Sequence, residues 1–495
     1  MEPLEEVRVQ KLKDIENLGL TPYPTFYRYT HTADRLVAEY SPKSAEELTQ
    51  DPTLVRVAGR ILAVRKFGKA GFLTISDNGA QIQAYVKKDQ VSERDFALYQ
   101  LLDLGDFIGV EGTMFRTRTG ELTVHASALS FLAKGLLPLP EKWHGLTDVE
   151  VRYRRRYVDL VTNPDVRGIF VKRSLIIREL RRFLDDNDYF EVETPILHSI
   201  AGGALAKPFK THHNALDMDL YLRIAPELYL KRLIVGGLNR VYDLNRNFRN
   251  EGVSFKHNPE YTMLEFYQAY SDYFDLMDLT EKMLSMVVAK VCGSLIVPFN
   301  GHEINFANWT RITMAEAIVK YSADRVSLED LKDRGKCELL LRAEHVECDA
   351  RLPHGNMIGL LFDHFAEKHL IQPTIVYDFP IELSPLAKCK RDDPSIVERF
   401  ELFIGGMELA NAYSELNDPV DQRSRFEGQL EARDRGDEEA HRMDEDYIRA
   451  LSYGMPPTAG EGIGIDRLTM ILTDSKSIRD VILFPHMRPE LPSKP

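Results

Sequence analysis

Five short runs of alternating apolar and polar residues between Val55 and Ala133 constrain the fold of this chain most. Glycine, aspartate and asparagine separate the runs, and each run has the length of a single β-strand. Five strands packed into roughly 80 residues predict a small closed β-barrel. We therefore expect a helical segment at 1–50, a barrel domain at 51–135 and a proline-rich linker at 136–150.

Longer segments of helical and strand character alternate over residues 151–495. The stretch Arg173–Asp188 has apolar residues at helical spacing. The stretches on either side of 253–258 predict two antiparallel strands joined by a loop, and residues 271–370, mostly helical in period, predict a helical insertion. Together these patterns favour an α+β domain with an antiparallel sheet flanked by helices.

Composition excludes some classes of protein. The chain has no run of about 18 apolar residues, so we expect no membrane span. Four cysteines without C-x-x-C spacing argue against a zinc site and a disulfide framework, and favour a reducing, cytoplasmic compartment. The net charge of −13 does not itself favour nucleic-acid binding, although basic clusters such as 152–156 could supply local patches.

Neither common glycine-rich phosphate loop is present, so a nucleotide site must be of another kind. The segment Phe248–Glu251 places an arginine and a carboxylate two residues apart, on one face if the segment is a strand. Such a pair can clamp a phosphate and accept the amine of adenine, although an isolated pair equally fits a cross-strand ion pair. The glycines of Gly460–Arg467 precede a predicted helix, where backbone can approach an anion closely.

Three segments, in this order along the chain, resemble the three sequence motifs of one family. Residues 173–195, a predicted helix ending at a proline, resemble motif 1 of class II aminoacyl-tRNA synthetases, His257–Tyr267 resembles motif 2, and Gly460–Arg467 resembles motif 3. The resemblance extends from about Val55 to Pro489. Segments 201–233 and 405–419 are similar to those of the lysine-specific members rather than the aspartate and asparagine members.

The resemblance implies a ligase that activates L-lysine with ATP and transfers it to the 3′-terminal adenosine of tRNA(Lys), acting as a homodimer. It implies catalytic roles for Arg249, Glu251 and Arg467. The ATP-binding residues that it implies are Arg249, Glu251, His257, Asn258, Tyr261 and Arg467. Tyr261 stands where phenylalanine is more usual in the family, and Lys207 where bacterial members often have arginine.

The resemblance also implies a lysine pocket and a magnesium site. The lysine-binding residues that it implies are Gly203 and Glu227 near the α-amino group, and Glu265, Tyr267, Asn411 and Glu415 near the ε-ammonium. Clustered carboxylates repel one another unless a cation joins them, which independently favours lysine as the substrate. Glu401 and Glu408 match the family's Mg²⁺ ligands, and we expect a bulge at Gly405 and Gly406 to bring both to one face of a strand.

The predicted barrel resembles the anticodon-binding OB-fold of the same family. Arg65, Phe72 and Gln83 match the residues that read the central uridine of the anticodon, by stacking and by hydrogen bonds to the base edge. Considered alone, Phe72 fits a core position as well.

Two alternatives remain open. One is a paralogue that lysylates a protein, but such proteins resemble the catalytic domain alone, and the predicted barrel argues against this reading. The other is a non-catalytic RNA-binding or regulatory relative, for which loss of Arg249, Glu251 or Arg467 would be expected; all three are present.

Overall fold

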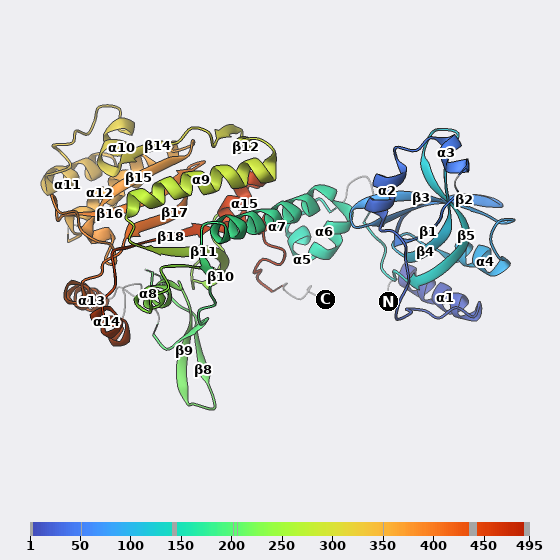
Figure 1. Ribbon diagram of the computed structural model, residues 1–495, viewed down its shortest axis with the longest axis horizontal. Coiled ribbons are helices and arrows are strands. Elements are labelled where there is room, and N and C mark those ends of the chain that lie inside the picture. The colour runs from blue at the N-terminus through green and yellow to red at the C-terminus, as the bar shows by residue number, and fades with distance from the viewer. Residues whose placement is uncertain are drawn as a thin grey trace. The chain divides into compact units, whose positions relative to one another are not determined.

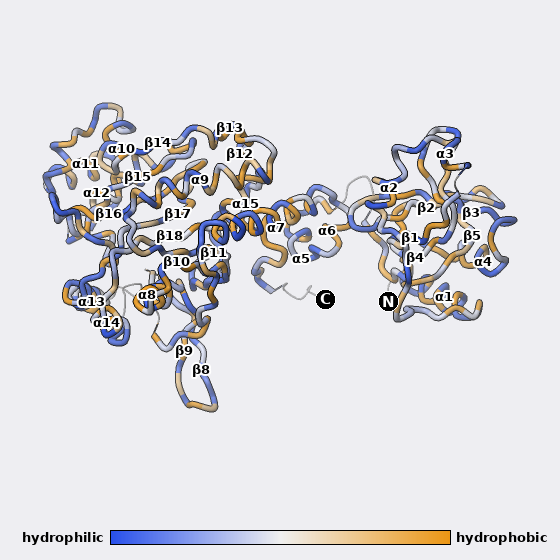
Figure 2. The backbone as a smooth tube through the Cα atoms, in the orientation of Figure 1, coloured by the Kyte–Doolittle hydropathy of each residue, from blue (hydrophilic) through white to orange (hydrophobic). Residues whose placement is uncertain are grey.

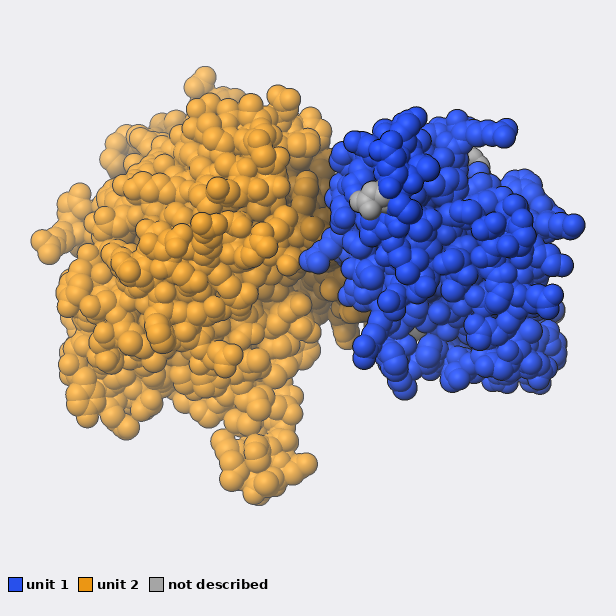
Figure 3. Space-filling model, turned by 45° about the vertical axis from the view of Figure 1, so that its right-hand side comes forward, with its two compact units in different colours: residues 1–167 blue, residues 168–495 orange. Residues whose placement is uncertain are grey.

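The protein is seen in a computed structural model that describes residues 3–50, 52–140, 146–200, 202–204, 206–349, 351–434 and 443–489. It forms two compact units, Met1–Arg167 and Gly168–Pro495 (Figure 3). The first unit extends beyond the expected linker at 136–150, because it includes α5 (Val149–Arg154) and α6 (Arg156–Thr162). Part of that linker, residues 141–145, lies outside the described residues.

The first unit is built around the expected five-stranded closed barrel. Its strands follow the order β1-β2-β3-β5-β4 around the barrel. Their bounds are β1 (Leu54–Phe67), β2 (Ala70–Asp77), β3 (Ala80–Lys87), β4 (Phe107–Arg116) and β5 (Leu122–Ala133). Every second residue of β2 and β3 points inward and is buried, and polar and apolar residues alternate along these strands (Figure 2). This period-two burial is what the alternating sequence predicts.

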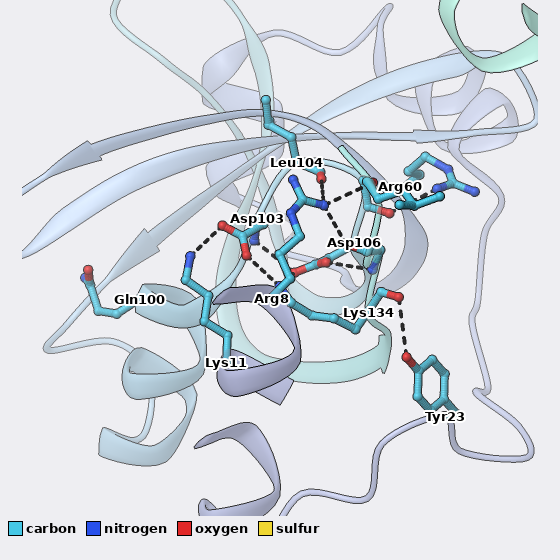
Figure 4. A network of polar contacts seen from close by, with 12 residues as sticks. Arg8, Lys11, Tyr23, Arg60, Gln100, Asp103, Leu104, Asp106 and Lys134 are labelled. Atoms are coloured by element: carbon cyan, nitrogen blue, oxygen red, sulfur yellow. Dashed lines mark hydrogen bonds and ion pairs between the residues drawn. The ribbon is translucent and has the colours of Figure 1, made fainter. Parts of the chain in front are cut away.

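Helices α1 (Pro3–Asn17), α2 (Ala33–Tyr40) and α3 (Ala45–Gln50) precede the barrel, and α4 (Glu93–Leu101) connects β3 with β4. A polar network ties α1 to the barrel unit (Figure 4). Arg8 of α1 donates to the backbone carbonyl of Leu104 at 3.2 Å. The buried ammonium of Lys134 donates to Asp103 and Asp106, at 2.7 Å in each case. The N-terminal segment is therefore part of the barrel unit.

An eight-stranded sheet forms the centre of the second unit (Figure 1). In spatial order its strands are β14 (Thr310–Thr313), β15 (Thr374–Pro380), β16 (Ile396–Ile404), β17 (Met407–Ser414), β18 (Thr458–Gly464), β11 (Glu260–Ala269), β10 (Arg240–Phe248) and β6 (Phe190–Glu191). The pairs from β15 to β10 are antiparallel, as expected, but the outermost pairs β14–β15 and β10–β6 are parallel. The sheet is therefore mixed, because both edge strands enter from crossover connections rather than hairpins.

Helices α7 (Pro164–Asp185), α9 (Tyr273–Cys292) and α15 (Ile465–Thr473) share a hydrophobic core with this sheet. Helix α7 corresponds to the predicted motif 1 helix, but it starts earlier and ends before Pro195. The chain leaves the helix through Asp188, whose φ of 62° is left-handed and cannot continue an α-helix. The expectation of a helix ending at Pro195 was therefore wrong.

Residues 271–370 are less uniformly helical than expected. They contain α9, α10 (Met314–Tyr321), α11 (Arg334–Ala343) and α12 (His354–Phe365), but also the hairpin β12 (Ile296–Phe299)–β13 (His302–Asn305) and the edge strand β14. Helices α10 to α12 share a second core with β15 and β16. Helix α9 packs against the main sheet, and β14 is one of its strands. Only the rest of this segment is therefore an insertion.

Candidate active site

One pocket in the second unit gathers most of the residues implied to bind ATP and lysine. Strands β11, β17 and β18, the loop after β10 and the start of α15 line it. The predicted residues among its lining are Gly203, Glu227, Arg249, Glu251, His257, Asn258, Tyr261, Glu265, Tyr267, Glu408, Asn411 and Arg467. Glu401 and Glu415 are not part of this lining.

Two buried glutamates, Glu227 and Glu265, line one end of the pocket, and a third, Glu415, lies against Gly460 of the lining; these three residues are called the acidic end. Glu227 begins helix α8 (Glu227–Val235), Glu265 lies on β11, and Glu415 follows the end of β17; their exposed fractions are 4%, 5% and 1%. Burial, reinforced by the nearby charge of Glu227, raises the pKa of Glu265 to about 8. An isolated cluster of this kind is electrostatically unfavourable, so it is suited to a cationic ligand.

Two residues at the acidic end were missed by the sequence reasoning. Lys231 is fully buried and forms ion pairs with Glu227, at 2.5 Å, and with Glu415. Tyr413 donates its hydroxyl to Glu227 at 2.7 Å. The pair of Glu227 and Lys231 is consistent with the sequence, since a glutamate and a lysine four residues apart lie on one face once the segment is a helix.

The glycines of β18 make room for these side chains. A Cβ on Gly460 would clash with the ring of Tyr267 and with Oε1 of Glu415. A Cβ on Gly462 would lie 3.4 Å from Cγ of Glu265. The absence of side chains at Gly460 and Gly462 therefore sets the depth of the acidic end.

Arg249 and Glu251 lie in the loop after β10, which ends at Phe248, so their expected position on a strand was wrong. The guanidinium of Arg249 lies 5.3 Å from the centroid of the Tyr261 ring. Its Nε is buried and, among the described residues, has no hydrogen-bond partner. A buried donor of this kind is costly unless a ligand accepts from it. Burial also raises the pKa of the Tyr261 hydroxyl to about 12.

Arg467 connects three elements at the other end of the pocket. It lies in the first turn of α15, and its Nη1 donates to the carbonyl and, at 3.2 Å, to the carboxylate of Glu408 on β17. Its Nη2 lies 3.4 Å from Nε2 of His257. Burial and the charge of Arg467 lower the pKa of His257, which favours the neutral imidazole. Arg467 and Arg249 thus give this end of the pocket two cations.

Glu401 and Glu408 lie on neighbouring strands rather than on one interrupted strand. Gly405 and Gly406 form the turn of the β16–β17 hairpin, and the bulge falls between Leu402 and Phe403. The expected bulge at the glycines was therefore wrong, because both have positive φ and reverse the chain instead. Within the described ranges, no group of three or more His, Cys, Asp or Glu residues is placed to hold a metal ion.

The surroundings of Glu401 are nevertheless rich in carboxylates. Burial raises the pKa of Glu401 to about 7; Glu408 and Asp363 add to this shift, while Arg399 opposes it. Arg399 forms an ion pair with Glu401 and donates to the side-chain oxygen of Asn411 at 2.9 Å. Arg399 was also missed by the sequence reasoning.

The three residues implied to read the anticodon lie together on the barrel. Arg65 of β1 pairs with Phe72 of β2, and Gln83 of β3 lies in the next strand. All three line one cavity of the first unit. The Phe72 ring lies 4.8 Å from that of Tyr85, and Gln83 accepts a hydrogen bond from Thr123 at 3.0 Å. Phe72 is only partly buried, so it is not a core residue.

Comparison with known families assigns both units. The model of the family described as tRNA synthetases class II (D, K and N) matches residues 148–488, and that of the OB-fold nucleic acid binding domain matches residues 55–132. A fold with the site described above and both matches defines a class II aminoacyl-tRNA synthetase.

Three relatives that cover nearly the whole chain narrow this class. The lysine--tRNA ligase of Carboxydothermus hydrogenoformans is 53% identical over 98% of this chain and 98% of its own length. Those of Bacillus cereus and Syntrophomonas wolfei are each 51% identical, over 97% and 98% of this chain and 96% and 97% of their own lengths. The chain therefore belongs to the lysine--tRNA ligase family of class II synthetases.

Proposed function

We propose that this protein activates L-lysine with ATP and transfers the lysyl group to the 3′-terminal adenosine of tRNA(Lys). The observation that carries the proposal is the pocket lined by two buried glutamates at one end, with the buried Glu415 adjoining them, and by two arginines at the other. A cationic amino acid fits the first end, and the phosphates of ATP fit the second. A substrate without the ammonium would leave buried charges unpaired, which disfavours its binding strongly.

Within the acidic end, Glu265 and Glu415 would bind the ε-ammonium of lysine, beside Tyr267 and Asn411. Glu227 and Gly203 would contact the α-amino end. Gly203 has a φ of 92°, and a Cβ there would lie 3.3 Å from the Cβ atoms of Ala225 and Glu227. The left-handed conformation and the close approach explain why a glycine is needed at this wall of the pocket.

At the cationic end, Arg249 would bind a phosphate through its unpartnered Nε, and Glu251 would accept the amine of adenine. Tyr261 would stack on the base, and Asn258, His257 and Arg467 would complete the nucleotide site. The lysine carboxylate would attack the α-phosphate, forming lysyl-adenylate and releasing pyrophosphate. No side chain needs to act as a nucleophile, because positioning and charge stabilisation by the arginines suffice.

Glu401 and Glu408 would hold Mg²⁺ on the phosphates. Burial and then the charges of Glu408 and Asp363 raise the pKa of Glu401, and a divalent cation held by Glu401 and Glu408 would relieve the repulsion between these two carboxylates. When bound, Mg²⁺ neutralises charge on phosphate oxygens. Arg399 and Arg467 orient the two carboxylates from behind.

We assign the barrel, residues 51–135, to the anticodon and the region from 151 onward to catalysis, with the helical part of 271–370 as an insertion. Arg65, Phe72 and Gln83 would read the central anticodon base. The reading as a protein-lysylating paralogue is disfavoured, because those proteins resemble the catalytic domain alone. The non-catalytic reading is disfavoured because Arg249, Glu251 and Arg467 all line the pocket.

We also propose a homodimer in the cytoplasm. Arg173 of α7 forms an ion pair with Asp466 at 2.6 Å, so a dimer contact through α7 would reach the residue next to Arg467. All four cysteines are free, which suits a reducing compartment. None of the helices in the described part of the chain is long and apolar enough to cross a membrane.

The test is ATP–pyrophosphate exchange with each of the 20 amino acids, without tRNA. We expect exchange with lysine alone. Exchange with a different amino acid would overturn the assignment of the acidic end, and no exchange with any amino acid would favour the non-catalytic reading.

A further inference from the structure

Lys231 is a fully buried cation directly behind the acidic end of the pocket. It lies one turn after Glu227 on α8, where the two side chains form an ion pair. The same ammonium forms an ion pair with Oε2 of Glu415, which approaches from the end of β17. Among the described residues that line the pocket are Glu227 and Glu265, but neither Lys231 nor Glu415. A ligand would therefore meet Glu227 and Glu265 first, with the pair of Glu415 and Lys231 next to them.

The two oxygens of Glu415 face different surroundings. Oε2 is directed to Lys231. Oε1 is buried, accepts no hydrogen bond from the described residues, and lies where a Cβ on Gly460 would be. Oε1 is therefore on the side of Gly460, which lines the pocket. The carboxylate is thus held from one side and open on the other.

The net negative charge of the glutamates and Lys231 complements the ammonium groups of a lysine ligand. Three glutamates and Lys231 together carry a formal charge of −2 when all are ionised, and lysine brings two ammonium groups. The pKa of Glu415 is raised well above its ordinary value, chiefly by burial, and the ammonium of Lys231 is what lowers it. Although burial alone lowers the pKa of Lys231, the charges of Glu227 and Glu415 raise it above its ordinary value. Lys231 is therefore a permanent cation.

The other titratable groups around this pair come from three packed elements. They are Glu265 and Tyr267 of β11, Tyr413 of β17 and Tyr447 of α14 (Glu445–Ser452). The pKa values of all three tyrosines are raised, chiefly by burial, so these groups stay neutral across the neutral range. The tyrosines therefore add no charge to this cluster in the neutral range.

We propose that Lys231 is a positioning residue that favours the ionised form of Glu415 through their ion pair and holds its Oε1 on the side of Gly460, so that lysine enters a preorganised anionic site. The inference rests on the proposed function, because it concerns recognition of the lysine ammonium. It adds a specificity determinant that does not touch the substrate. Without the cation, burial would favour protonated Glu415, which binds an ammonium poorly.

The test compares Lys231→Met and Lys231→Arg with the wild-type enzyme in lysine-dependent ATP–pyrophosphate exchange between pH 6.5 and 9. For Lys231→Met we expect the KM for lysine to rise about tenfold or more at pH 7 and to approach the wild-type value as the pH rises and Glu415 ionises. The KM for ATP should change little. Lys231→Arg keeps the charge and should keep the wild-type pH dependence, even if its KM is altered.

Lys134→Met is the matched control, since Lys134 is another fully buried lysine paired with two carboxylates, but in the barrel unit. It should not change the pH dependence of the KM for lysine. A KM for lysine in Lys231→Met that is unchanged, lowered, or raised equally at every pH would overturn the inference. If Lys231→Met does not fold, a pH dependence in Lys231→Arg that is displaced upward would overturn it instead. Absence of lysine-dependent exchange in the wild type would refute the proposed function. Normal exchange in the wild type, together with one of the two overturning results for the Lys231 variants, would refute only the role of Lys231.

Discussion

The guanidinium of Arg249 lies 5.3 Å from the centroid of the Tyr261 ring, while its Nε is buried without a hydrogen-bond partner in the described chain. The aromatic face holds the cation in the pocket before any ligand arrives. Tyr261 thus positions the guanidinium, while Nε remains available to donate to a ligand such as a phosphate.

Replacing Arg249 with alanine should reduce lysine-dependent ATP–pyrophosphate exchange by about a hundredfold to a thousandfold, because charge stabilisation at the α-phosphate is lost. Thermal stability and tRNA binding should change little, since the side chain forms no ion pair with any residue that the structure describes. Arg351→Ala is the control, because 90% of that side chain is exposed. Exchange at the wild-type rate in Arg249→Ala would show that the residue has another role.

Replacing Gly460 with alanine should raise the KM for lysine roughly tenfold or more, because the new methyl group clashes with Tyr267 and Glu415. Overpacking of this kind costs about 1–3 kcal/mol. Gly428→Ala in α13 (Pro419–Asp434) is the matched control, since a Cβ there meets nothing within 4 Å. If both variants bind lysine equally well, the depth of the acidic end does not depend on Gly460.

Replacing Phe72 with alanine should weaken binding of tRNA(Lys) by roughly tenfold, since base stacking contributes about 1–3 kcal/mol. Exchange measured without tRNA should be unaffected, because Phe72 lies in the barrel unit. The control is Phe26→Ala, an aromatic of the same unit that is 73% exposed and outside the cavity lined by Phe72. Equal tRNA affinity for both variants would contradict a stacking role for Phe72.

We predict that Glu461 makes the stability of the folded protein depend on pH. This residue of β18 accepts a hydrogen bond from Thr280 of α9, and burial raises its pKa to about 8. Because the folded-state pKa lies above the unfolded value, the folded state holds the proton more tightly. The associated stability is present at low pH and is lost as the pH rises from about 5 through 8, by up to about 1.4 kcal/mol per pH unit.

Glu461→Gln should remove this loss, since an amide cannot ionise. Urea unfolding at pH 5, 7 and 9 should show the free energy of unfolding falling more steeply for the wild type than for the variant. Glu265, whose pKa is also raised to about 8, is present in both proteins and cancels in the comparison. Parallel dependence on pH for the two proteins would contradict the buried protonated state of Glu461.

The barrel was predictable because its signal is local. Alternation with a period of two and short polar turns determine both the strands and the buried face. Strands β10, β11 and β18 were also predicted, but burial does not alternate along them, so the pattern alone does not determine their buried face. The hairpin β12–β13 also had a local signal that was overlooked: Asn300-Gly301 adopts positive φ at both positions, as a two-residue hairpin turn requires.

The edge strands β6 and β14 could not be predicted locally. β6 has two residues and β14 four, and each gains its partner through a crossover that depends on the tertiary fold. The residues of the site also divide into those that the sequence reveals locally and those that only the tertiary fold brings together. Motif residues such as Arg249 and Arg467 are recognisable in sequence, whereas the ion pair of Lys231 with Glu415 joins segments far apart along the chain. Their proximity follows from packing rather than from any spacing.

The attachment of α1 bears on how the anticodon-binding part can be isolated. Arg8 donates to the carbonyls of Leu104, Gly135 and Leu137, which lie before β4 and after β5. A fragment cut at the sequence boundary of the barrel, near residue 51, would leave these carbonyls without their donor. The unit of folding is thus larger than the unit of recognition, and a stable fragment for RNA-binding work must include the first helix.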